Sequence, residues 1–153
     1  MSTDRKNRHE RIIASLEQQR LPFRQRSIFL RHLDCGSCNA CELELHALTN
    51  VVYDVAQYGI HFVASPRHAD VILMTGIYTR SLDVAAQAVI DAMPVPRVIT
   101  IGDCAQGGGI FHESYAICQI PERITRAIIG HVPGCPPEPG DILQKLLNIS
   151  LRG

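Results

Sequence analysis

Five of the six cysteines fall in three short segments that could together bind a metal centre. Three lie within seven residues, at Cys35, Cys38 and Cys41, and the others are Cys104, in Gly-Asp-Cys-Ala, and Cys135, in Pro-Gly-Cys-Pro-Pro. Thiolates are ligands of zinc and of iron–sulfur clusters, and four of them complete either site. The spacing leaves the first pair open, because Cys35/Cys38 and Cys38/Cys41 are both C-x2-C.

The distribution of these cysteines favours an iron–sulfur cluster over zinc. Structural zinc sites prefer two short C-x2-C knuckles, whereas Cys104 and Cys135 are single and far apart in the chain. Gly107–Gly109 lie a few residues after Cys104, and Pro136 and Pro137 directly follow Cys135. Such loops let backbone amides approach cluster sulfurs and tune the reduction potential. A thioredoxin-type C-x-x-C motif is a third interpretation, but it leaves Cys104 and Cys135 without a role.

Alternating strand and helix patterns predict an α/β fold with a mainly parallel sheet. The apolar run 69–75 is typical of a central strand covered on both faces. Between the strands, Leu48, Val51, Val52 and Val55 predict one buried helix face, and Ser81 is expected to cap the next helix. We expect strands over 27–33, 60–64, 69–75, 97–101 and 127–132, with a last helix carrying Ile142, Leu143, Leu146 and Leu147.

The predicted strands bring the cysteines to one edge of the sheet. The first cysteine segment follows the first strand, Cys104 follows the fourth and Cys135 follows the fifth. Ligands of open parallel sheets bind outside the carboxyl ends of the strands. We therefore predict a flavodoxin-like open sheet flanked by helices, with the metal centre at the carboxyl-terminal edge of the strands.

Composition and charge limit the classes of partner, the domain organisation and the location that the chain can have. The chain has 153 residues, with 15 Lys and Arg against 15 Asp and Glu, so charge gives no argument for nucleic-acid binding. We expect a basic extension over 1–26 with a helix at 8–20, one domain over 27–150 and a tail over 151–153. No apolar run is long enough for a membrane span or a signal peptide, which predicts a cytoplasmic protein. Cysteines in that compartment stay reduced and are available as metal ligands.

Several ordered segments carry a family resemblance. They are C-x2-C-E-L-E at 38–44, S-P-R-H-A-D-V at 65–71, G-D-C-A-x-x-G-G at 102–109, G-I-F-H at 109–112 and V-P-G-C-P-P-x-P at 132–139. Together they resemble the small subunit of membrane-bound, energy-converting [NiFe]-hydrogenases of the formate hydrogenlyase type. That subunit is homologous to the cluster-bearing 20 kDa-type subunit of respiratory complex I. The resemblance covers about residues 28–147.

The resemblance implies one [4Fe–4S] cluster, held by Cys38, Cys41, Cys104 and Cys135 beside the active site of a large subunit. The chain would be an electron-transfer subunit of a hydrogenase, an oxidoreductase complex, without a complete active site of its own. The implied partners are the [NiFe]-hydrogenase-type large subunit, a ferredoxin-like iron–sulfur subunit and membrane subunits. Through them the protein would lie on the inner face of the cell membrane.

Two alternatives remain. The pattern of the complex I subunits has a tandem Cys-Cys at the first ligand position. This chain does not resemble it there, because position 40 is Ala40. That departure favours the hydrogenase over a complex I-like NADH:quinone oxidoreductase. A zinc-stabilised structural module is an alternative of another class.

The resemblance also selects among the remaining candidate residues. Glu44, three residues after Cys41, matches an acidic position of the family, which favours the Cys38/Cys41 pair and leaves Cys35 as the alternative ligand. Glu44 could relay protons near the partner's metal site, or it could belong to a salt bridge. Cys118 is expected to be a small core residue. His68 and His112 are expected to form structural hydrogen bonds.

Overall fold

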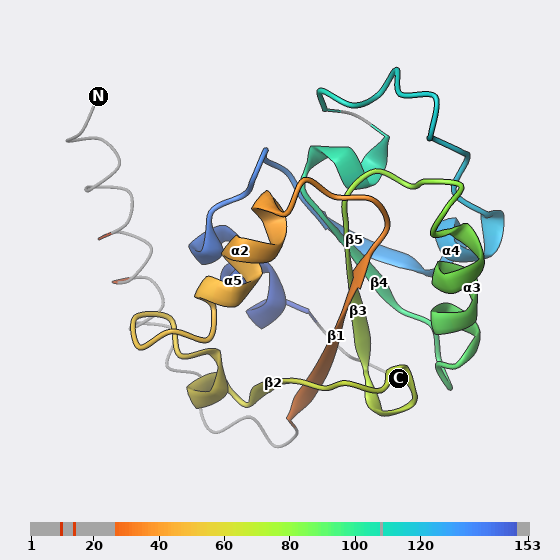
Figure 1. Cartoon of the computed structure of the whole chain (residues 1–153). Coiled ribbons are helices and arrows are strands. Elements are labelled where there is room, and N and C mark those ends of the chain that lie inside the picture. Colours follow the sequence, from red (N-terminus) through yellow and green to blue (C-terminus); the bar gives the residue numbers. More distant parts are fainter. Residues whose placement is uncertain (1–9, 11–13, 15–26, 108, 150–153) are drawn as a thin grey trace.

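Five parallel strands form the centre of the structure (Figure 1). The computed structural model describes Glu10, Ala14 and residues 27–107 and 109–149. The strands lie in the order β2-β1-β3-β4-β5, and each neighbouring pair is parallel. This order confirms the predicted flavodoxin-like α/β fold. Their bounds are β1 (Ile28–Asp34), β2 (Ile60–Phe62), β3 (Val71–Thr75), β4 (Val98–Ile101) and β5 (Ile128–Val132).

Helices cover both faces of this sheet. α2 (Ala40–Ala47) and α5 (Pro139–Leu147) cover one face, and α3 (Asp83–Asp91) and α4 (Glu122–Ala127) cover the other (Figure 1). The described residues also form three short 3₁₀ helices: η1 (Val55–Tyr58), η2 (Pro66–His68) and η3 (Asp103–Gln106). The helix predicted over 8–20 lies outside the described residues, apart from Glu10 and Ala14.

Strand β3 joins the two hydrophobic layers. All its residues are buried, as the apolar run predicted. Side chains alternate between the faces of a strand, so Val71 and Leu73 pack with α2 and α5, while Ile72 and Met74 pack with α3 and α4. Full burial of a side chain of this size contributes about 1.5–3 kcal/mol. The rigid central strands therefore fix the loops that follow them.

The helix after the first cysteine segment is shorter than predicted. α2 ends at Ala47, and Val51 is 97% exposed. The side chain of Asn50 accepts hydrogen bonds from the backbone amides of Val52 and Tyr53. Such a local bond competes with helical hydrogen bonding and stabilises a turn. The periodic valines therefore predicted the wrong structure, although Val55 is buried in η1.

Two other boundaries also differ from the prediction. Ser81 does not cap α3, because the residue that precedes the helix is Leu82 and no side chain caps it. The hydroxyl of Ser81 instead lies 3.3 Å from that of Thr79. Ala127 was expected to begin the last strand but ends α4, so that β5 starts at Ile128. The predicted last helix is confirmed by α5, whose four apolar residues are all buried.

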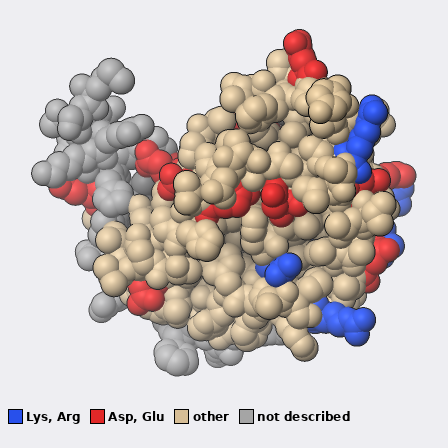
Figure 2. All heavy atoms as spheres, in the orientation of Figure 1, with Lys and Arg blue, Asp and Glu red and all other residues tan. Residues whose placement is uncertain are grey.

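Acidic residues outnumber basic ones between residues 27 and 149. Residues 27–149 contain twelve Asp and Glu against seven Lys and Arg. Figure 2 shows acidic side chains in a band that crosses the region of α2 and β1. This face is therefore electrostatically suited to basic partners.

Candidate metal centre

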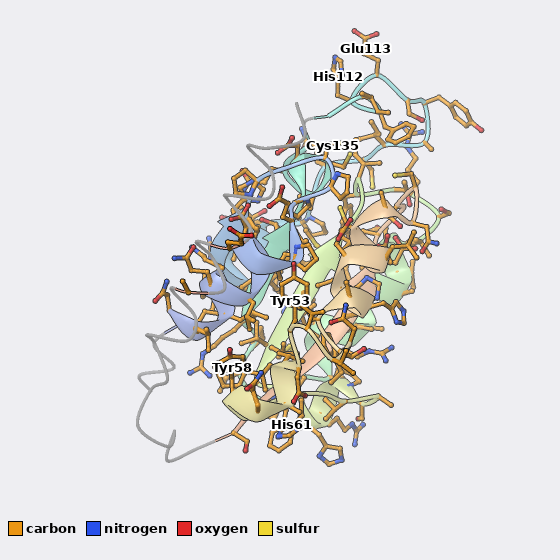
Figure 3. All side chains as sticks on the ribbon, turned by 90° about the vertical axis from the view of Figure 1, so that its left-hand side faces the viewer. Tyr53, Tyr58, His61, His112, Glu113 and Cys135 are labelled. Carbon is orange, nitrogen blue, oxygen red and sulfur yellow. The ribbon has the colours of Figure 1, made fainter. Side chains whose placement is uncertain are left out.

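Four cysteines surround one pocket at the carboxyl-terminal edge of the sheet. Cys38, Cys41, Cys104 and Cys135 line it, together with Phe111. They come from the loop after β1, the first turn of α2, η3 and the loop after β5. Figure 3 shows Cys135 toward the end of the molecule that carries His112 and Glu113, with His61 at the opposite end. The fold thus gathers three segments that lie far apart in the sequence.

The first cysteine loop is ordered by the residue that ends β1. Oδ1 of Asp34 accepts hydrogen bonds of 2.8 Å from the backbone amides of Gly36 and Ser37. The hydroxyl of Ser37 then accepts one from the amide of Asn39, just before α2. These bonds bend the chain so that Cys38 and Cys41 both reach the pocket.

A reciprocal pair of hydrogen bonds joins the other two cysteine loops. The amide of Asp103 donates to the carbonyl of Gly134 at 2.9 Å, and the amide of Gly134 donates to Oδ1 of Asp103 at 2.8 Å. The amide of Gly102 also donates to the carbonyl of Val132, which extends the pairing of β4 and β5. Cys104 and Cys135 each follow one member of the reciprocal pair, so their positions are fixed relative to each other.

Two glycines leave room for thiol sulfurs. A Cβ atom at Gly109 would lie 2.7 Å from Sγ of Cys104, and one at Gly102 would meet Sγ of Cys41. Both glycines have positive φ, which L residues rarely adopt. The backbone can therefore approach the sulfurs closely, as loops around iron–sulfur clusters require.

The four thiols perturb one another's ionisation. Burial, and after it the nearby Glu42, Cys104, Cys38 and Cys135, together raise the pKa of Cys41 from 9.0 to about 12. Burial and then Cys135 and Cys38 likewise raise the pKa of Cys104. Four thiolates would therefore repel one another here unless positive charge lay between them. Iron or zinc would supply that charge.

Cys35 lies away from this pocket. Its side chain is completely buried in the core on the side of α3 and α4, and its carbonyl accepts hydrogen bonds from the amide and hydroxyl of Thr79. Burial raises its pKa to about 12, with smaller effects of Asp34 and Cys118. Cys118 is half-buried and packs against the same core. Neither cysteine is among the residues that line the pocket of the other four.

The other predicted residues have simpler surroundings. Glu44 is half-buried on α2, close enough to Tyr53 to help raise the pKa of that phenol, after the larger effects of burial and Glu138. Nδ1 of His112 lies 3.0 Å from the carbonyl of Gly109, which confirms a structural hydrogen bond. His68 is exposed in η2.

Sequence reasoning missed Glu42, the residue after Cys41. Its side chain is buried, and the hydroxyl of Thr75 donates a hydrogen bond to Oε1. Nε2 of His32 lies 3.4 Å from the same oxygen. The signal was available, because Glu42 stands three residues before the buried Leu45 on the same face of α2. An acidic residue at such a position indicates a specific partner.

Comparisons with known proteins identify the family. Residues 38–149 match the family described as NADH ubiquinone oxidoreductase, 20 Kd subunit. The chain belongs to this family. It is therefore a member of a family of oxidoreductase subunits, as the resemblance predicted.

Two curated relatives are named as subunits of a formate hydrogenlyase and of a membrane-bound hydrogenase. Formate hydrogenlyase subunit 7 of Escherichia coli is 38% identical over 132 residues, which are 86% of this chain and 51% of that protein. This chain thus spans about half the length of that relative. The probable membrane-bound hydrogenase subunit mbhJ of Pyrococcus furiosus is 38% identical over 144 residues, 94% of this chain and 83% of that protein.

Solved structures share the fold. A chain of the membrane-bound sulfane sulfur reductase, an archaeal respiratory membrane complex, superposes with a TM-score of 0.64 and 25% identity, covering 81% of this chain and 70% of that one. A chain of the [NiFeSe] hydrogenase of Desulfovibrio vulgaris Hildenborough gives a TM-score of 0.58 at 15% identity, covering 82% of this chain and 60% of that one, which shows the fold alone. Among the described residues, no helix is both long and apolar enough to cross a membrane.

Proposed function

We propose that this chain is the electron-transfer small subunit of a membrane-associated [NiFe]-hydrogenase complex. Cys38, Cys41, Cys104 and Cys135 hold one [4Fe–4S] cluster, which exchanges electrons with the active site of a large subunit where protons and H2 interconvert. The observation that carries the proposal is the convergence of these four thiols on one pocket. The hydrogenase relatives supply the reaction class.

The surroundings of the thiols support a cluster as the ligand. Mutual repulsion of the thiolates is relieved by the positive charge of the irons. Gly102 and Gly109 keep the backbone close to the sulfurs, where amides stabilise the reduced form. In the described part of the chain, no three His, Cys, Asp or Glu side chains are grouped as ligands of one metal ion. Four thiols spread around a pocket suit a multi-iron cluster better than a single zinc ion.

An apolar surface beside the cysteines supports a docking role. Ile110 is 77% exposed, and Phe111, which lines the cysteine pocket, is 38% exposed. Pro136 is exposed beside Cys135, whereas Pro137 is buried. An electron carrier must bring its cofactor close to its acceptor, so the large subunit covers this surface. Burial of Ile110 and Phe111 against that partner adds hydrophobic stabilisation.

The remaining partners follow from the relatives. The Pyrococcus relative is named as a membrane-bound hydrogenase subunit, and this chain joins a similar assembly with membrane subunits and a ferredoxin-like iron–sulfur subunit. It lies on the cytoplasmic side of the membrane, held there by these partners.

The second candidate function is the cluster-bearing subunit of a complex I-like quinone oxidoreductase, which the family description favours. Ala40 favours the hydrogenase, because the pattern of the complex I subunits has a second, adjacent cysteine at this position.

Iron and acid-labile sulfide analysis of the anaerobically purified protein tests the cluster. We expect about four irons and four sulfides per chain. One tightly bound zinc without sulfide would instead support the zinc-stabilised structural module.

Single cysteine replacements test the ligand set. We expect Ala at 38, 41, 104 or 135 to remove or degrade the cluster, whereas Cys118→Ala retains it. Cys35→Ala is the matched control within the first segment, because Cys35 is buried outside the pocket. Loss of iron in Cys35→Ala with retention in Cys41→Ala would reverse the assignment of the first pair.

A further inference from the structure

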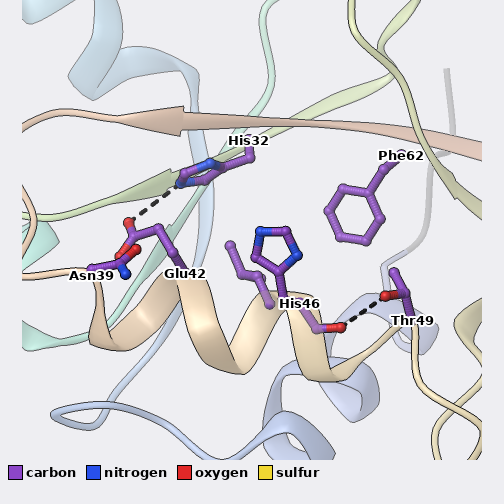
Figure 4. A pocket seen from close by; sticks show the side chains of 7 residues that line it. His32, Asn39, Glu42, His46, Thr49 and Phe62 are labelled. Carbon is purple, nitrogen blue, oxygen red and sulfur yellow. Dashed lines mark hydrogen bonds and ion pairs between the residues drawn. The ribbon is translucent and has the colours of Figure 1, made fainter.

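A second pocket lies on the outer side of α2, between that helix, β1 and β2 (Figure 4). Its volume is ≈ 330 Å³, and its lining includes His32, Glu42, Leu45 and Phe62. Strand β2 pairs only with Ile28–Leu30, so the carboxyl half of β1 has no neighbouring strand on this side among the described residues. The pocket is therefore open to a chain that approaches along the edge of the sheet.

The polar wall of this pocket is a chain of three hydrogen-bonding groups. Nε2 of His32 lies 2.8 Å from the hydroxyl oxygen of Thr75, and that hydroxyl donates its only proton to Oε1 of Glu42. Nε2 of His32 must therefore carry the proton that it donates to Thr75. Burial lowers the pKa of His32 below its usual 6.5, so the ring is neutral near pH 7. It does not balance the charge of the Glu42 carboxylate.

The second oxygen of that carboxylate lacks a partner. Oε2 of Glu42 is buried and accepts no hydrogen bond from the described residues. No Lys or Arg is among the described residues that line the pocket, and Arg31, next to His32, belongs to the opposite face of β1 by strand alternation. Buried carboxylates are normally paired with donors or cations. A cationic donor that enters through the pocket would supply the missing partner.

The rest of the lining suits one kind of cation. Leu45 is buried and apolar, and Phe62 presents a ring at the opposite side of the pocket (Figure 4). An arginine side chain lays its aliphatic stem on such surfaces and stacks its guanidinium against an aromatic ring. Its planar fork also binds a carboxylate through two parallel hydrogen bonds, which a lysine cannot do. Because Oε2 is buried, the broad terminal torsion of Glu42 must rotate to bring it to the guanidinium.

We propose that this pocket receives an arginine side chain from a partner protein, which pairs with Glu42. The acid excess of residues 27–149 and the acidic band over this face supply the charge complementarity (Figure 2). The unpaired edge of β1 offers backbone groups to the segment that carries the arginine. The site does not include the four cysteines, so the proposal stands independently of the cluster.

Ligand-observed saturation-transfer NMR with the full chain tests the proposal. The probe is N-acetyl-arginine methylamide, and its uncharged isostere N-acetyl-citrulline methylamide is the control. We expect the arginine probe to bind at least about tenfold more tightly, because only it forms charge-assisted hydrogen bonds with Glu42. Equal binding of the two probes, or no binding of the arginine probe, would overturn the proposal.

Variants locate the probe in this pocket. Glu42→Gln should weaken arginine binding at least about tenfold, whereas Glu44→Gln, with the same charge change on the same helix, should leave it unchanged. Thr49→Phe fills the exposed rim without altering Glu42 and should also abolish binding, which covers the case in which Glu42→Gln unfolds. Retained binding in both Glu42→Gln and Thr49→Phe would show that the arginine probe binds elsewhere.

Discussion

Gly102 lies directly against the thiol of Cys41. A Cβ atom at position 102 would stand 2.6 Å from Sγ of Cys41, closer than real Cβ contacts come. The residue that follows the fourth strand therefore limits where the sulfur of a distant helix can lie. This contact links the backbone of η3 with the first turn of α2.

Gly102→Ala should reduce cluster binding by displacing the sulfur of Cys41. We expect less iron per chain after anaerobic reconstitution than in the unaltered protein. Gly107→Ala is the control, because Gly107 also has positive φ but a Cβ atom added there would have nothing within 4 Å. Equal iron content in the two variants would mean that Cys41 either is not a ligand or moves freely.

Thr75→Val should destabilise the folded chain. The change removes the hydroxyl that donates to Glu42 and accepts from His32, while it conserves the shape of the side chain. A buried carboxylate oxygen then loses its donor, which costs about 1–3 kcal/mol of unfolding free energy. Chemical denaturation measures this loss, and Thr49→Val at an exposed position is the control. An unchanged midpoint in Thr75→Val would indicate that water replaces the hydroxyl.

Alkaline pH should destabilise the protein through Cys35. Burial raises the pKa of this thiol from 9.0 to about 12 in the folded chain, so the folded state keeps a proton that the unfolded state loses above pH 9. The stabilising contribution is complete below pH 9 and falls by about 1.4 kcal/mol per pH unit as the pH rises toward 12.

Cys35→Ala isolates this effect from those of the other thiols. The difference in unfolding free energy between the unaltered chain and the variant should be constant between pH 7 and 8.5 and should shrink above pH 9. Chemical denaturation across this range measures it. A difference that stays constant up to pH 11 would contradict the raised pKa of Cys35.

If Glu44 relays protons in the proposed hydrogenase complex, Glu44→Gln should lower H2 turnover while the cluster and its reduction potential remain. The amide keeps the shape and most hydrogen bonding of the carboxylate but cannot exchange a proton. Turnover, iron content and potential are measured on the same preparation. Turnover near that of the unaltered complex would assign Glu44 a structural role on α2.

The sequence was sufficient for the fold and for the gathering of the cysteines. Short apolar runs that alternate with helical patterns can be buried only as a parallel sheet between helices, and the carboxyl ends of such strands share one edge. That rule predicted that the segments of Cys38, Cys104 and Cys135 meet. Local turn chemistry was harder to predict, because the side chain of Asn50 overrode the helical period of Val51 and Val52.

Only the tertiary structure separated cysteines of equal spacing and revealed the environment of Glu42. Cys35/Cys38 and Cys38/Cys41 have the same spacing, but Asp34 turns the chain so that Cys35 enters the core and Cys41 faces the pocket. The partners of Glu42 come from β1 and β3, 10 and 33 residues away. Spacing along the chain describes neighbours within one element, whereas burial and pairing depend on which elements the folded core brings together.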